Sequence, residues 1–263
     1  MFEYHKDKDR YFEMQYLTAR DFIIPFIQTS KKLDPDFRVL EIGCAEAGVL
    51  KAFLEISAIA VGIDLNKSRI ELANEYHQEA VASGQIQFLN ENIYKLRPQD
   101  NGMELFDVIV LKDVIEHIPE QEKFIPHLSR FLKNDGVIFF GFPPWNMPFG
   151  GHQQMCRSSW LARLPWVHLL PAFLYKSLLK LTKQAPAVLE ELMEIKETGI
   201  SIERFEKICR QSQLSIVNKR FYLTNPIYKF KFGLQPKILF SIFAAIPYLR
   251  NYYTTAAYYL IQK

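Results

Sequence analysis

Two glycines and two glutamates mark the stretch of this sequence best suited to holding a small ligand. Residues 39–48 read V-L-E-I-G-C-A-E-A-G, an apolar run that stops at Gly43 and is followed by small residues up to Gly48. Glycine has no Cβ, so a ligand can approach the backbone, and the first amides of a following helix point at it. Glu41 and Glu46 would repel a phosphate. The turn therefore favours an uncharged or cationic ligand.

A carboxylate follows at the end of the next apolar run. Residues 58–63 read A-I-A-V-G-I and lead directly into Asp64. A carboxylate at the end of a second strand, about 20 residues after a glycine turn, holds ribose hydroxyls in nucleotide-binding sheets. Asp64 could instead cap a helix that begins near Ser68. We favour the ribose-binding interpretation, and one residue can both bind a ribose and cap a helix.

Two histidines are candidate general bases, because an imidazole can take a proton from a hydroxyl near neutral pH. His152 lies in the stretch 143–154, whose three prolines and two glycines exclude regular structure. It is either a base or a loop anchor. His117 lies between Ile115 and Ile118, a position more typical of a packing residue. The sequence shows no C-x-x-C pair and no carboxylate–histidine cluster with ligand spacing, so no metal site is expected.

The elements that position these residues are strands alternating with helices. Apolar runs end near residues 42, 63, 89, 111 and 142, with helical patterns at 49–56, 66–83 and 121–133. This alternation predicts a parallel, doubly wound α/β sheet. Ligands bind such sheets beyond the carboxyl ends of the strands, which is where the residues named above fall. Further strands are expected at 214–223 and 252–261.

Glu41, Gly43 and Gly48 resemble motif I, E-x-G-x-G-x-G, of the class I (Rossmann-like) S-adenosylmethionine-dependent methyltransferases, with Ala45 in place of the middle glycine. Residues 112–119, K-D-V-I-E-H-I-P, resemble the stretch that follows strand four in many small-molecule members of that family. The resemblance implies a seven-stranded mixed sheet in the order 3-2-1-4-5-7-6, with strand seven antiparallel.

The resemblance also implies a cofactor site for S-adenosylmethionine, with S-adenosylhomocysteine as the product. Asp64 would bind the ribose, and the backbone of Leu111 and Lys112 would lie beside the methionine part. Asn92 takes the place of the usual aspartate that accepts from the adenine amino group, or it caps its own turn. The Lys112 side chain either meets an anionic substrate or reaches solvent. The other residues assigned to the site are Cys44, Leu65 and Ile93.

A chain of 263 residues has room for one α/β core with insertions. We expect a single domain over residues 1–263, with helical insertions after strand five (143–200, a helical cap) and between strands six and seven (226–247, rich in aromatic residues). Residues 1–34 form helices that either pack on the sheet edge or act as a lid, with Tyr11 or Tyr16 as contacts. The apolar and basic stretch 160–182 forms a helical subdomain that covers the sheet, a cap over an apolar substrate or an amphipathic surface that rests on a membrane.

Composition narrows the function. The net charge is only +3, with no block of basic residues, so no nucleic-acid partner is expected. The three cysteines form no spaced pair, which favours the cytoplasm, and no apolar stretch is long enough to span a bilayer, although peripheral membrane contact fits the aromatic insertions. We therefore expect a transferase that methylates a small-molecule acceptor, most simply on oxygen. The acceptor would be apolar, lipid-linked or a glycan.

Two rival functions remain at this point. A nicotinamide-dependent oxidoreductase could use the same sheet, but the G-x-G-x-x-G turn is missing and Glu46 lies where a pyrophosphate would bind. A non-catalytic, donor-binding or membrane-associated scaffold would also explain the aromatic insertions. Binding of S-adenosylmethionine against NAD separates the first pair, and turnover of bound donor separates the second.

Overall fold

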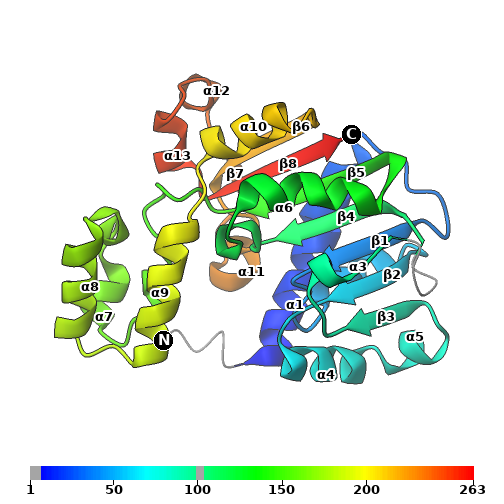
Figure 1. Ribbon diagram of the computed structural model, residues 1–263, viewed down its shortest axis with the longest axis horizontal. Helices are drawn as coiled ribbons and strands as arrows, with labels where there is room; N and C mark the ends of the chain where they lie inside the picture. Colours follow the sequence, from blue (N-terminus) through cyan, green and yellow to red (C-terminus); the bar gives the residue numbers. More distant parts are fainter. Residues whose placement is uncertain (1–6, 99–103) are drawn as a thin grey trace.

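The computed structural model describes residues 7–98 and 104–263, in which eight strands form one mixed sheet with helices on both faces (Figure 1). The strand order is β3-β2-β1-β4-β5-β8-β6-β7. The strands are β1 (Arg38–Ile42), β2 (Ile59–Ile63), β3 (Ile86–Leu89), β4 (Phe106–Lys112), β5 (Leu132–Phe142), β6 (Ser215–Thr224), β7 (Lys237–Ile238) and β8 (Ala256–Gln262).

The first five strands are parallel, and their central members are buried on both faces. Leu40 pairs with Val61 of β2 and with Ile109 of β4, and Leu40 and Ile109 have no exposed surface. Such near-continuous runs of branched apolar residues are typical of parallel strands covered by helices. β8 pairs antiparallel with both β5 and β6. The predicted order and the antiparallel strand are confirmed, with β8 as the expected seventh strand.

The predicted count of seven strands misses one, because the second insertion adds the two-residue edge strand β7 against β6. The last long strand also begins later than expected. Tyr252 and Tyr253 belong to helix α13 (Leu249–Tyr253), where Arg250 and Asn251 bind the carboxylate of Glu203. These buried polar contacts keep the segment before β8 helical.

Two of the predicted helices are shorter or broken. The helix that begins at residue 121 is α6 (Gln121–Leu128), which passes through a 3-10 turn into β5 at Leu132, so residues 132–136 are strand. The helix expected at 66–83 is split at His77 into α4 (Lys67–Tyr76) and α5 (Gln78–Ala82), and the ring Nε2 of His77 lies 3.1 Å from the carbonyl oxygen of Ala47.

Helices from different parts of the chain cover the two faces of the sheet. On one face the core contains residues from the N-terminal helices, from α3 and from α4. The N-terminal helices are α1 (Lys8–Thr18), a π turn (Ala19–Ile23) and α2 (Ile24–Gln28), and α3 spans Gly48–Leu54. On the other face the core contains residues from α6 and from α10 (Ile202–Gln211). This three-layer arrangement leaves the carboxyl ends of the parallel strands accessible.

The first insertion forms a separate helical lobe with its own small apolar core. Pro165 and Pro171 divide it as predicted into short helices: α7 (Ser159–Arg163), a 3-10 turn (Val167–Leu169) and α8 (Ala172–Leu181), which are followed by α9 (Pro186–Thr198). Figure 1 shows this lobe on the side toward which the parallel strands point. The second insertion contains α11 (Tyr228–Phe232), β7 and α12 (Ser241–Ala244). Within the described ranges, no helix combines the length and apolar character that crossing a bilayer would require.

Candidate functional site

The turn between β1 and α3 is packed so closely that it needs both of its glycines. Gly43 has a φ of +69°, a conformation that favours glycine, and the amides of Gly43 and Cys44 both donate to the carbonyl oxygen of Ile63. A Cβ on Gly43 would lie 2.5 Å from a methyl carbon of Val114. A Cβ on Gly48 would lie 2.4 Å from the backbone oxygen of Phe12. The turn is therefore wedged between the segment after β4 and helix α1.

Ala45, which replaces the middle glycine of the motif, adopts the backbone conformation that glycine would prefer. Its φ is +51°, in the left-handed region that costs an alanine about 1 kcal/mol or more. The amide of Ala45 donates to Oδ2 of Asp64 at 2.9 Å. This charge-assisted hydrogen bond holds the turn in place and offsets the strain. The departure from the motif thus leaves the shape of the turn intact.

A pocket lies directly above this turn, and we call it the turn pocket. Its volume is about 440 Å³ with its open mouth included. The turn supplies one wall, and side chains from α1, α4 and the end of β4 supply the rest. These side chains are Tyr11, Phe12, Gln15, Arg69, Lys112 and Asp113. The pocket lies at the carboxyl ends of β1 and β4, where ligands of parallel α/β sheets bind.

Asp64 ties the turn to the end of β2. Its Oδ2 accepts from Ala45 and its Oδ1 accepts from the amide of Asn66 at 2.8 Å. The cap of α4 is Asn66 and not Asp64, because Oδ1 of Asn66 accepts from the amides of Ser68 and Arg69. Each oxygen of an ionised carboxylate has two acceptor sites, so Asp64 keeps capacity for two more hydrogen bonds.

Three other predicted cofactor residues follow β2 and β3. Leu65 is 73% exposed beside Asp64, whereas Ile93 is buried. Oδ1 of Asn92 accepts from the amide of Tyr94 at 2.9 Å and caps a 3-10 turn (Ile93–Lys95). Asn92 therefore fills the turn-capping role left open by the sequence, and its oxygen retains one further acceptor site.

The floor of the turn pocket carries buried charges. Lys112 is buried at the end of β4, next to buried Leu111, and its ammonium group pairs with the carboxylate of Asp113. Of the two roles expected for Lys112, the one that reaches solvent is wrong. Glu41 is 3% exposed, and burial raises the pKa of its carboxyl group well above its usual value against the attraction of Lys112. Its Oε2 has no hydrogen-bond partner among the described residues.

Carboxyl groups outnumber cationic side chains in the lining of the turn pocket. Its lining includes the carboxyl groups of Glu41, Glu46 and Asp113 and the two cations Arg69 and Lys112. Glu46 is 4% exposed, and its closest cation is the guanidinium of Arg69 at 3.8 Å. A pyrophosphate would meet these carboxylates, whereas a cationic ligand would be attracted to them. The carboxyl groups of the lining therefore agree with the ligand class inferred from the turn.

Cys44 contributes packing and backbone to the turn pocket. Its side chain is buried, and burial together with the nearby carboxyl groups of Glu41 and Asp64 raises the pKa of the thiol far above its usual value. A thiol in that state is not a nucleophile.

Of the two N-terminal tyrosines considered as contacts, only Tyr11 reaches the turn pocket. Its hydroxyl oxygen accepts from Nε2 of Gln15 at 2.5 Å, and both residues line the pocket. The hydroxyl of Tyr16 instead donates to Oε2 of Glu55 at 2.9 Å. Helix α1 is therefore a wall of the pocket through Tyr11 and Gln15.

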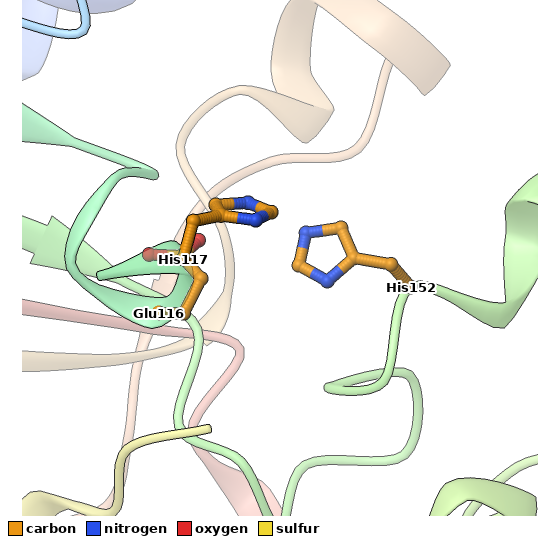
Figure 2. Close-up of side chains that lie close together, drawn as sticks. All are labelled: Glu116, His117 and His152. Carbon is orange, nitrogen blue, oxygen red and sulfur yellow. The ribbon is translucent and has the colours of Figure 1, made fainter. Parts of the chain in front are cut away.

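The two candidate bases meet beside the end of β4, together with a glutamate. Glu116, His117 and His152, which we call the Glu116 cluster, each offer a ligand atom within 4.8 Å of the others. The imidazole rings of His117 and His152 have centroids 5.2 Å apart. Figure 2 shows the two rings approaching one another from different segments, with the Glu116 carboxylate next to His117. The sequence shows no such cluster with ligand spacing, because His152 comes from a segment 35 residues after His117.

Hydrogen bonds to α9 hold the 3-10 turn Ile115–His117 that carries two of these residues. The hydroxyl of Thr198 donates to the backbone oxygen of Glu116 at 2.5 Å, and Nε2 of Gln121 donates to the backbone oxygens of both Ile115 and Thr198. The helical lobe therefore positions the cluster. Burial of its ring lowers the pKa of His117, against the attraction of the carboxylates of Asp113 and Glu194.

Sequence reasoning did not assign Gln15, Arg69, Asp113 or Glu116 to the site. Asp113 and Glu116 both lie in the stretch 112–119. Their positions close to His117 in the sequence could have identified them as site residues. Gln15 and Arg69 gave none, because their place in the pocket depends on how α1 and α4 pack over the turn.

Residues 40–140, which run from β1 to β5, match the family model of a methyltransferase domain. Two curated relatives are ubiquinone biosynthesis O-methyltransferases. The protein from Haemophilus ducreyi is 30% identical over 105 residues, which is 39% of this chain and 43% of the relative. The protein from Bartonella quintana is 27% identical over 164 residues, which is 60% of this chain and 63% of the relative. The chain thus spans about half the length of these relatives.

Solved structures share the fold over nearly the whole chain. A S-adenosylmethionine-dependent methyltransferase from Clostridium acetobutylicum aligns with a TM-score of 0.58 and 14% identity, over 94% of this chain and 91% of that chain. The plantazolicin methyltransferase BpumL, in complex with a triazolic desmethylPZN analog and SAH, aligns with a TM-score of 0.59 and 14% identity, over 99% of this chain and 88% of that chain. These matches show that the chain has the fold of S-adenosylmethionine-dependent methyltransferases and that its residues 40–140 match the model of a methyltransferase domain.

Proposed function

We propose that this chain transfers the methyl group of S-adenosylmethionine to a hydroxyl oxygen of a small molecule and releases S-adenosylhomocysteine. The observation that carries the proposal is the turn pocket, whose glycine-built wall and excess of carboxyl groups fit a cationic nucleoside. The names of the curated relatives support oxygen as the atom methylated. When bound, the cofactor supplies an activated methyl group on a positively charged sulfur.

The residues around the turn pocket fit the separate parts of this cofactor. We propose that Asp64 accepts from the ribose hydroxyls with its remaining acceptor sites. Leu65, Asn92 and Ile93 would then surround the adenine, since they follow β2 and β3. The methionine part would lie along Gly43, Cys44, Ala45 and Gly48, with Glu41 and the backbone of Leu111 and Lys112 beside its ammonium group. The part of the predicted lid that the structure describes, residues 7–34, would cover the donor through Tyr11 and Gln15, and residues 1–6 lie outside the described residues.

For the transfer itself, the chain has to align the acceptor, exclude water and receive a proton. A C–O bond forms as the C–S bond breaks, and the acceptor hydroxyl loses its proton. Holding the reactants at attack distance can supply about 7 to 11 kcal/mol of the barrier. His152, and next to it His117, are the candidate groups for taking the proton, because their rings face one another beside the segment that follows β4.

Calorimetry with the purified chain tests the donor. S-adenosylmethionine and S-adenosylhomocysteine should bind with one-to-one stoichiometry, whereas NAD should give no heat, because Glu41 and Glu46 line the pocket that a pyrophosphate would enter. Incubation of the complex with a panel of hydroxyl compounds should then yield S-adenosylhomocysteine. Binding of NAD in preference to the sulfonium donor would favour the oxidoreductase. Donor binding without turnover on any acceptor would favour the scaffold.

We propose further that the helical lobe rests on an anionic membrane surface from which an apolar or lipid-linked acceptor is taken. Several large apolar side chains of α7 and α8 are exposed, with Trp160 at 60%, Phe173 at 69% and Leu181 at 79%. Residues 157–189 contain five lysines and arginines and no aspartate or glutamate. Apolar side chains interleaved with basic ones are typical of helices that lie on membranes.

Sedimentation with lipid vesicles checks this contact. The chain should co-sediment with vesicles containing phosphatidylglycerol, and less so at high salt or with phosphatidylcholine alone, because each basic residue near the surface adds about 1 kcal/mol. Exchanging Phe173 and Leu181 for serine should abolish most of the binding. Val217→Ser, at an exposed position of β6, is the matched control and should bind as the wild type. Equal binding of all three proteins would contradict the proposal.

A further inference from the structure

The Glu116 carboxyl group is buried, but its protein surroundings supply neither the hydrogen bonds nor the ion pair that would offset the cost of burial. It is 2% exposed, and neither of its oxygens has a hydrogen-bond partner among the described residues. None of the ion pairs found in residues 7–98 and 104–263 includes it, and the nearby ammonium group of Lys112 pairs with Asp113. A buried carboxyl group is normally neutralised, paired or bound to a metal ion. Glu116 therefore has unused capacity to coordinate a cation.

The groups next to Glu116 are metal ligands by type. His117 and His152 each offer a ring nitrogen, which together with one carboxylate oxygen makes a set of two imidazoles and one carboxylate. This set binds zinc in hydrolytic enzymes and other first-row divalent cations, and it leaves at least one coordination position open. Calcium and magnesium prefer sites made of oxygen atoms alone. The ligand types thus favour a transition-metal ion.

The spacing of the three ligand atoms is slightly wider than a bound ion would require. Their mutual distances lie within 4.8 Å, whereas ligands at about 2.0–2.2 Å from a tetrahedral ion lie about 3.4 Å apart. Glu116 is fixed by the bonds between its turn and α9. His117 is exposed, so its ring can turn without displacing packed neighbours. Small rotations of the two rings, which already face one another in Figure 2, would complete the set.

We propose that the Glu116 cluster binds one divalent transition-metal ion, of which Zn²⁺ fits the ligand set best, and that the open position faces the acceptor. Asp113, three residues before Glu116, lines the turn pocket, so the ion would lie beside the donor. Such an ion would act as a Lewis acid that lowers the pKa of an acceptor hydroxyl and so favours loss of its proton to water. This role for the ion rests on the proposed function, whereas its binding does not.

Metal binding is measured directly on the full chain after treatment with a chelator. Titration with Zn²⁺ in a calorimeter should show one site, and Co²⁺ in its place should give the visible absorption of a low-coordinate complex. Glu116→Gln, His117→Ala and His152→Ala should each weaken binding roughly tenfold or more. His127→Ala is the control, because His127 lies on α6 against Tyr94 and Phe131 and outside the cluster. Its titration should match the wild type.

Two results would overturn the proposal. One is a wild-type chain that binds no Zn²⁺ or Co²⁺ more tightly than the Glu116→Gln variant does. The other is tight binding that all three cluster variants retain, which would place the ion elsewhere. Thermal unfolding of each variant shows that it is folded. Binding of S-adenosylmethionine by the metal-free chain is measured in parallel, so a failure of the donor proposal is seen separately.

Discussion

Replacing Asp64 by alanine is expected to weaken the binding of S-adenosylmethionine roughly a hundredfold or more. A hydrogen bond to a charged group contributes about 1.5–3 kcal/mol, and a carboxylate that holds two ribose hydroxyls loses both bonds on truncation. The substitution also removes the hydrogen bond of 2.9 Å that the amide of Ala45 donates to Asp64. The turn under the donor therefore loses the contact that holds it in place. Calorimetric titration of both proteins gives the two dissociation constants.

A neighbouring substitution separates donor binding from local stability. Asn66→Ala removes the cap of α4, which should cost about 1 kcal/mol of folding free energy and leave donor affinity within twofold of the wild type. Asp64→Asn should fall between the wild type and Asp64→Ala, since Ala45 and Asn66 donate to different oxygens of Asp64 and an asparagine keeps only one of them. If Asp64→Ala retains the donor as tightly as Asn66→Ala does, the ribose assignment and with it the proposed donor site are wrong.

The part of the fold that surrounds Asp64 was predictable because it depends on local patterns. The apolar runs of the parallel strands are continuous, each is bounded by polar or glycine-containing turns, and their carboxyl ends must meet at one edge of the sheet. Gly43 and Asp64 therefore come together from the strand order alone. The prediction of the order itself came with the family resemblance, since periodicity does not show which strands are neighbours.

The remaining features depend on contacts between distant segments. β7 has only two residues, and its pairing with β6 leaves no periodic signal. The pairing of Lys112 with Asp113 requires the φ of +54° at Asp113, which the sequence does not show. The Glu116 cluster needs the loop that carries His152 to fold back against the turn that carries His117, and α9 holds that turn. The spacing of residues in sequence motifs therefore does not reveal this pair of histidines.

Replacing His152 by alanine is expected to lower kcat for methyl transfer by roughly two orders of magnitude or more. The effect follows whether His152 takes the proton from the acceptor hydroxyl or holds an ion that lowers the pKa of that hydroxyl. The dissociation constant of S-adenosylmethionine should stay unchanged, because His152 does not line the turn pocket. Single-turnover formation of S-adenosylhomocysteine measures the first quantity, and calorimetry measures the second. A variant within threefold of the wild-type rate would exclude both roles.

The comparison of His152→Ala with its neighbours then separates a base from a bound ion. A base acts alone, so His117→Ala and Glu116→Gln should cost little, and the double histidine variant should equal His152→Ala. An ion needs all three ligands, so each single variant should fall to the same low rate and the double variant should fall no further. Because Glu116 is buried behind His117, Glu116→Gln is the more decisive of these variants. A large loss of rate there, with donor affinity preserved and with Zn²⁺ binding lost in the same variant, supports a carboxylate that acts through an ion.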